Sequence, residues 1–124
     1  MRSLNKAFLM GNLVSDPNET PLAKGGSMVS FPLATNRDYV QDGEKKKVTD
    51  FHRIVIWGKQ LGEVAKKYLI KGSAVYVEGK ITNRTYDNKN GEKQFITEIV
   101  ADELNIITWK KGSSPELGTL AEQS

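Results

Sequence analysis

One helical repeat, set among stretches that alternate like β-strands, limits most strongly what this chain can fold into. Its apolar side chains recur at the spacing of a single helix face, namely Leu61, Val64, Ala65, Tyr68 and Leu69. Before and after this repeat, the apolar pattern has the period of two that is typical of strands. We therefore predict an all-β fold that carries one short helix.

Five segments have the strand pattern, three before the helix and two after it. They cover residues 4–14, 28–35, 49–59, 74–81 and 94–107. Asp42-Gly43 predicts a hairpin between the second and third segments, whereas Pro32 cannot donate to a β-ladder and predicts an edge or a bulge. The order β-β-β-α-β-β is expected of a five-stranded Greek-key barrel of the oligonucleotide-binding type (OB-fold), with the helix between strands 3 and 4; other small barrels stay open.

The length of 124 residues and the hydrophobic content of 38% suffice for one core. We predict one domain over residues 1–111 and a short disordered tail over residues 112–124. The chain has no cysteine, no apolar leader and no long apolar run, so we expect an unprocessed, cytoplasmic protein without a membrane partner. Trp109 follows the last strand, and we expect it to pack at the end of the barrel.

Aromatic rings and cations are interleaved along the third strand segment. By strand alternation one face carries Phe51, Arg53, Val55 and Trp57, whereas the other carries His52, Ile54 and Ile56. Rings stack bases and cations neutralise phosphate, so the first face is typical of a protein that binds single-stranded nucleic acid. The net charge of +3 agrees with a polyanionic partner, and the part before the tail is more basic still because the tail has two acids and no cation.

No catalytic or metal site is expected from the sequence. His52 is the only histidine, and neither a set of metal ligands nor a nucleophile with its base accompanies it, so we expect a hydrogen-bonding role in the interior or at an interface. Gly11, Gly58, Gly72 and Gly79 do not form a nucleotide-binding loop and are better explained as bulge, turn and cap residues. We therefore predict no cofactor, no bound metal and no enzymatic activity.

Eight short motifs follow one another along nearly the whole predicted barrel. They are Asn5-Lys6, Gly11-Asn12-Leu13 with Asp16-Pro17, Phe31 to Thr35, Phe51-His52-Arg53, Gly58-Lys59, Lys71-Gly72-Ser73, Val77-Glu78-Gly79 and Thr97-Glu98. In this order they resemble the bacterial-type single-stranded DNA-binding proteins. The resemblance implies a homotetramer of oligonucleotide-binding barrels that coats single-stranded DNA in replication, recombination and repair, associated with the nucleoid in the cytoplasm.

The resemblance also implies which residues contact DNA. The stacking positions of the family fall on Tyr39, Phe51, Trp57 and Tyr86, and all four keep a ring here. Its phosphate contacts fall on Lys6, Arg53, Lys59, Lys71 and Arg84, with Arg2, Arg37 and Lys80 as further candidates near the same surface. Asn5 and His52 are assigned to the subunit interface.

The long linker and acidic tip through which the family recruits replication and repair proteins have no counterpart here. We therefore expect DNA coating without recruitment through such a tip, and a phage or plasmid origin stays open. Two other functions also stay open: a primosome-type accessory barrel that acts mainly through protein contacts, and an RNA-binding barrel such as a cold-shock or anticodon-binding domain. A primosome-type accessory barrel is expected to lack the four rings, which this chain keeps. Base stacking alone does not distinguish an RNA-binding barrel from a DNA-binding one.

Overall fold

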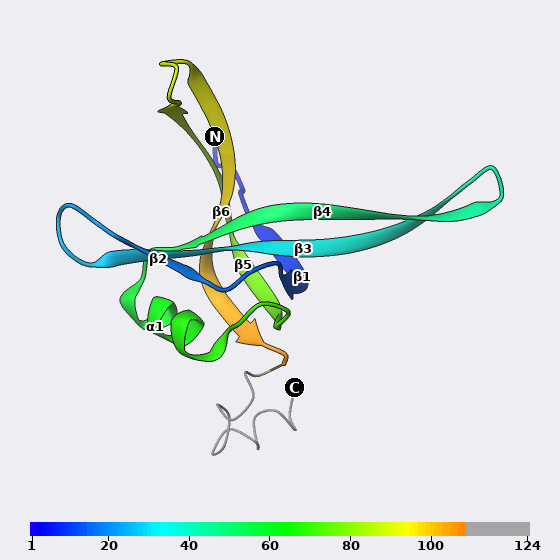
Figure 1. Cartoon of the computed structure of the whole chain (residues 1–124), viewed down its shortest axis with the longest axis horizontal. Helices are drawn as coiled ribbons and strands as arrows, with labels where there is room; N and C mark the ends of the chain where they lie inside the picture. The colour runs from blue at the N-terminus through cyan, green and yellow to red at the C-terminus, as the bar shows by residue number, and fades with distance from the viewer. Residues whose placement is uncertain (109–124) are drawn as a thin grey trace.

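Six strands and one helix occupy residues 1–108, the part of the chain that the computed structural model describes (Figure 1). They are β1 (Ala7–Leu13), β2 (Asn18–Pro21), β3 (Ser27–Gln41), β4 (Glu44–Ile56), α1 (Lys59–Tyr68), β5 (Ala74–Asp87) and β6 (Lys93–Ile106). The expected disordered tail and the expected packing of Trp109 lie outside the described residues.

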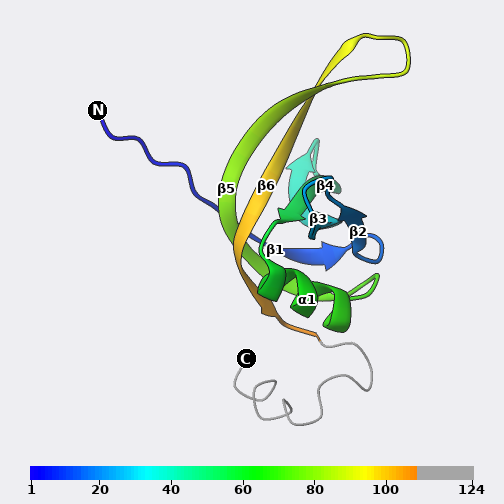
Figure 2. The same ribbon diagram turned by 90° about the vertical axis from the view of Figure 1, so that its left-hand side faces the viewer.

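Five of the strands close into a barrel. They pair in the order β1, β5, β6, β4, β3, and a further pairing between the end of β1 and β3 joins the first strand to the last. β4 and β6 run parallel, and the other pairs are antiparallel. Figure 2 shows β5 and β6 curving around one side, with α1 at the end where β5 begins and β6 ends. The predicted five-stranded barrel with one helix between its third and fourth strands is confirmed.

The short strand β2 is not predicted by the sequence analysis. The turn signal at Asp16-Pro17-Asn18 suggests only a loop, but Asn18–Pro21 pairs with Ser27–Ser30 of β3. The side chains of β2 are mostly exposed and show no apolar alternation, so only its main-chain pairing marks it as a strand. Pro32 falls between the two strands that pair with this side of β3, since β2 begins at Asn18 opposite Ser30 and β1 ends at Leu13 opposite Leu33. The predicted local edge is therefore present on this side of Pro32.

Two long hairpins project from the barrel in different directions (Figure 1). The β3–β4 hairpin turns at Asp42 and Gly43, whose φ angles of 53° and 78° fit the type I′ turn that an Asp-Gly pair favours. The β5–β6 hairpin turns at Asn88, whose Oδ1 accepts hydrogen bonds from the backbone N–H groups of Asn90 and Glu92, each at 2.9 Å. The strands extend beyond the segments predicted from apolar alternation. Both faces of the hairpins are largely exposed and polar, so the sequence shows no alternation there.

The core lies inside the barrel and continues onto the helix. Ala65 and Leu69 join the buried apolar side chains of the strands, so the helical stripe faces the core as predicted. Gly72, expected as a cap, instead takes its left-handed φ of 92° in the turn between α1 and β5, since the helix already ends at Tyr68. Gly79 lies at a register shift between β5 and β6, which confirms a bulge there.

Candidate nucleic-acid interface

The outer face of β4 carries two of the predicted site residues, Phe51 and Arg53. His52 pairs with the fully buried Leu33 of β3, and its neighbours Phe51 and Arg53 therefore lie on the opposite face of the strand. Phe51 has an exposed fraction of 68%. Its ring is thus presented to solvent beside a guanidinium group, as the alternation predicts.

One buried carboxylate holds Arg53 and Arg84 together. Glu98 belongs to β6, which lies between β4 and β5, and its side chain is only 4% exposed. Arg53 Nε donates to Glu98 Oε2 at 2.7 Å, and Arg84 donates from Nε to Oε1 at 3.0 Å and from Nη2 to Oε2 at 3.1 Å. Burial raises the pKa of the Glu98 carboxyl, but the bonds from Arg84 and Arg53 outweigh burial and lower this pKa overall. Glu98 is therefore ionised at neutral pH.

A groove of about 350 Å³ adjoins Phe51 and Arg53. Its lining includes Asp16 from the loop after β1 and Asn18 at the start of β2. Asp16 Oδ1 accepts a hydrogen bond from the backbone N–H of Lys71 at 2.7 Å, which ties the loop after α1 to this groove. Phe51 and Arg53 therefore line this groove, and the backbone of Lys71 is bonded to one of its lining residues.

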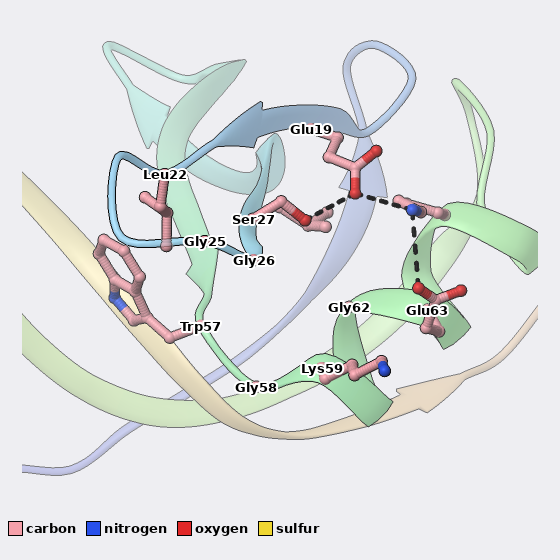
Figure 3. Close-up of a pocket in the computed structure, with 12 residues that line it drawn as sticks. Glu19, Leu22, Gly25, Gly26, Ser27, Trp57, Gly58, Lys59, Gly62 and Glu63 are labelled. Carbon is pink, nitrogen blue, oxygen red and sulfur yellow. Dashed lines mark hydrogen bonds and ion pairs between the residues drawn. The ribbon is translucent and has the colours of Figure 1, made fainter.

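Trp57 lies in a second groove and not beside Phe51. β4 ends at Ile56, so the strand alternation that predicts a shared face does not reach Trp57, and that prediction is wrong for this residue. The indole is 51% exposed and lines, with Leu22 and Lys59, a groove of about 290 Å³ between α1 and the β2–β3 loop (Figure 3). Trp57 and the predicted phosphate contact Lys59 therefore line the same groove.

Ion pairs connect β2 to α1 on another wall of this second groove (Figure 3). Lys66 Nζ lies 2.8 Å from Glu19 Oε2 and 3.7 Å from Glu63 Oε1, and Ser27 Oγ donates to Glu19 Oε2 at 2.6 Å. The bond between Lys66 and Glu19 lowers the pKa of Glu19 and raises the pKa of Lys66. Within residues 1–108 Lys59 has no ion-pair partner, so its charge is not neutralised by a neighbour.

The other two predicted rings lie on the projecting hairpins. Tyr39 is part of the β3–β4 hairpin, and Tyr86 is part of the β5–β6 hairpin, two residues after Arg84 and on the same strand face. Arg37 is two residues before Tyr39 and donates from Nε to Asp50 Oδ2 at 3.0 Å. The fold therefore distributes the four rings over two grooves and two hairpins and does not gather them in one cleft.

The remaining predicted cations differ in their surroundings. Lys6 Nζ lies 3.7 Å from Asp102 and 4.0 Å from Glu78, so this cation already has two carboxylate neighbours. Lys80 is exposed on β5, and Arg2 is exposed before β1. In the described part of the chain, Lys80 and Arg2 make no ion pair.

Both residues assigned to a subunit interface have partners within the chain. Asn5 continues the β1–β5 ladder, because its Nδ2 donates to the carbonyl of Ile81 at 2.7 Å and its Oδ1 accepts from the N–H of Ile81 at 2.9 Å. His52 is half-buried, and its Nε2 lies 2.8 Å from Thr35 Oγ1. These contacts give each residue a structural role within the chain. Their role at a subunit interface stays a prediction.

The sequence analysis missed the role of Glu98 and two exposed rings, Phe8 and Phe95. Glu98 appears there only as part of a motif, and its one distinguishing signal is a charge within an apolar strand. Phe8 and Phe95 are 59% and 81% exposed, but alternation does not say which face of a strand is covered. No cluster of three or more His, Asp or Glu in residues 1–108 is arranged to hold a metal ion. The same residues include no helix long and apolar enough to cross a membrane.

The sequence profile described as the single-strand binding protein family matches residues 4–107. This chain belongs to that family. Its curated relative "Single-stranded DNA-binding protein 1" from Chlorobaculum tepidum is 42% identical over 108 residues, which are 86% of this chain and 66% of that protein. The chain thus spans just under two thirds of the length of this relative.

A solved structure is also similar to this member of the single-strand binding protein family. It is described as "Plasmodium falciparum SSB complex with ssDNA", with a TM-score of 0.80 and 33% sequence identity. The match covers 87% of this chain and 98% of that one. The oligonucleotide-binding barrel expected from the order of strands is therefore confirmed by a related structure.

Proposed function

We propose that this protein binds single-stranded DNA with little preference for sequence, by stacking bases on exposed rings and holding phosphates with lysine and arginine. The observation that carries the proposal is the exposed ring of Phe51 beside the cluster of Arg53, Glu98 and Arg84. A ring stacks on any base, and a guanidinium group binds phosphate whatever base is attached to it. Such a surface favours a strand whose bases are unpaired, because a duplex keeps its base faces covered.

The second groove and the hairpins extend the proposed path of the DNA. Trp57 supplies a ring and Lys59 a cation in the second groove, and both are accessible there. Tyr39 and Tyr86 offer rings on the hairpins. The other proposed phosphate contacts are Arg2, Lys6, Arg37, Lys71 and Lys80, of which Lys6 and Arg37 already have carboxylate partners.

We assign this binding to the coating and protection of single strands in replication, recombination and repair, in the cytoplasm and without enzymatic activity. Membership of the single-strand binding family and the DNA in the related structure support this role. The curated relative is longer than this chain, so the proposal covers DNA binding and leaves recruitment of other proteins aside.

We also propose that the protein works as a homo-oligomer, with a homotetramer as the family's arrangement. β1 pairs with β3 only at Asn12 and Leu13, so the rest of β1 has a strand edge without a partner among the described residues. Phe8 and Met10 of the same strand are 59% and 64% exposed. An open edge beside exposed apolar side chains supports pairing with a second copy.

Tryptophan fluorescence during titration with oligo-dT tests the proposed binding. We expect strong quenching that weakens as the salt concentration rises and that persists when duplex DNA is added as competitor. No quenching, or an equal preference for duplex, would contradict the stacking site and favour a barrel that binds proteins. Competition with oligo-U decides between DNA and RNA, since stronger binding of the RNA would favour an RNA-binding domain.

Replacing Trp57 by alanine tests the stacking assignment. Stacking of a base on a ring is worth about 1–3 kcal/mol in proteins that bind single strands, so we expect the Trp57→Ala variant to bind roughly 5- to 150-fold more weakly. Lys46→Ala is the control, because Lys46 lies on the β3–β4 hairpin and pairs with Glu44 at 3.6 Å. Anisotropy of a labelled oligo-dT measures both variants. Equal losses would show that Trp57 is not a stacking residue.

A further inference from the structure

Three side chains from three neighbouring strands meet at one point of the sheet. Arg53 comes from β4, Glu98 from β6 and Arg84 from β5. Both guanidinium groups donate to the same atom, Glu98 Oε2, at 2.7 Å from Arg53 and 3.1 Å from Arg84. One carboxylate therefore fixes the relative position of two cations that belong to different strands.

Each arginine keeps hydrogen-bond donors that Glu98 does not use. A guanidinium group has five N–H donors, of which Arg53 uses the one on Nε, and Arg84 uses Nε and one on Nη2. The arginine side chains are 38% and 48% exposed, whereas that of Glu98 is 4% exposed. Both arginine side chains therefore reach solvent, while the carboxylate is covered.

The charges in this cluster do not cancel. Two guanidinium groups and one carboxylate leave a net positive charge, and the carboxylate offsets the repulsion that would otherwise separate the two cations. Planar N–H forks held at fixed positions match the oxygens of a phosphate group. The ligand that suits the unused donors is thus an anion with several acceptor oxygens, which every linkage of a DNA strand supplies.

We propose that Glu98 is a positioning residue that joins Arg53 and Arg84 into one subsite for a single backbone phosphate. This inference rests on the proposed function and refines it. Glu98 removes some positive charge from the DNA-binding face, but it holds both forks in place before the phosphate arrives. Binding then requires less ordering of two long side chains, which is a general source of affinity.

Glu98→Gln distinguishes positioning from simple charge attraction, because the two predict opposite results. If only charge mattered, removing a carboxylate would strengthen the binding of DNA. If Glu98 positions the arginines, we expect roughly three- to tenfold weaker binding of oligo-dT. The slope of log Kobs against log salt should also become shallower by about 0.7, the value for one phosphate contact on a single strand.

Glu44→Gln is the matched control, since it makes the same change at an exposed position of the β3–β4 hairpin. We expect this variant to bind oligo-dT like the parent protein or slightly more tightly, with the same salt slope. In a background of Arg53→Ala and Arg84→Ala, adding Glu98→Gln should not weaken binding further, because Glu98 acts through the two arginines. A further loss in that background would contradict the proposal.

Arg53→Lys provides a test that leaves Glu98 in place. Lysine keeps the charge but lacks the planar fork, so we expect weaker binding with little change in the salt slope, which counts neutralised phosphates. Circular dichroism identifies variants that do not fold, and if Glu98→Gln is one of them, Arg53→Lys decides the question. Unchanged affinity for oligo-dT in the folded Arg53→Lys variant would overturn the subsite. Because the parent protein is titrated alongside, its failure to bind oligo-dT would separately overturn the proposed function.

Discussion

Gly11 and Gly79 show how single residues allow this barrel to close. A Cβ at Gly79 would collide with the backbone oxygen of Val100 on β6, and a Cβ at Gly11 would collide with the backbone oxygen of Ala34 on β3. Neither glycine has a positive φ, so space and not conformational freedom requires glycine. The strands approach one another closely at these two points.

We expect Gly79→Ala to lower the free energy of unfolding by about 1–3 kcal/mol, because the backbone of β6 must move to admit the methyl group. Gly58→Ala is the control, since Gly58 has a φ of −73° and a Cβ added there would meet no neighbouring atom within 4 Å; we expect a change below about 0.5 kcal/mol. Urea denaturation measures both. Similar values for the two variants would show that the strands can separate without cost at Gly79.

Glu98 also predicts how stability depends on pH. Its pKa in the folded protein lies below the ordinary value of 4.5, so its contribution to stability is complete above about pH 4.5 and is lost as the pH falls through the lower folded pKa. We expect Glu98→Gln to be less stable than the parent protein at neutral pH and to lose less stability on acidification. Urea denaturation at several pH values checks this, and parallel pH profiles would contradict it.

The role of a residue could be predicted only where it follows from the pattern of its neighbours in the sequence. Alternation correctly places Phe51 and Arg53 opposite His52 because these residues lie within one paired strand. It fails for Trp57, which lies beyond the last residue of β4. The role of Glu98 depends on arginines from two other strands, and the spacing of these residues along the sequence does not predict that they are in contact.

At the scale of elements, burial decides which strands can be read from the sequence. The five barrel strands each have a covered face, so their apolar residues alternate and predict them. β2 and the outer parts of the hairpins have little covered surface, and alternation is absent there. The Asp42-Gly43 turn is the exception, because the positive φ angles of the turn restrict which residues fit it.

Asn88 is expected to hold the end of the β5–β6 hairpin. Asn88→Ala removes the acceptor for the N–H groups of Asn90 and Glu92, so we expect faster hydrogen exchange at these two amides while the barrel amides are unchanged. Lys89→Ala is the control in the same turn, since neither of these two hydrogen bonds involves the Lys89 side chain. Equal protection of Asn90 and Glu92 in both variants would contradict a role for the Asn88 side chain.

At the scale of the whole molecule, the barrel is closed by pairing but β1 is not fully covered. Its partner on one side is β5 over the whole of Ala7–Asn12, whereas β3 reaches only its last two residues. Phe8 and Met10 are exposed on this strand. A face with these properties is more stable when another surface covers it, and a second copy brings the same open edge and the same apolar side chains.

Phe8→Asp therefore tests the proposed oligomer. A charge in place of the ring would have to be desolvated on assembly, so we expect the parent protein to be a homo-oligomer at micromolar concentration and the variant to shift to smaller species in light scattering. Val40→Asp is the control, because Val40 is also exposed but lies near the tip of the β3–β4 hairpin; its mass should match that of the parent. A monomeric parent would contradict assembly itself. In the monomer the aspartate would be exposed to solvent, so it would be unfavourable only where a second subunit covers it. A Phe8→Asp variant that stays oligomeric would therefore show that the interface does not include this part of β1.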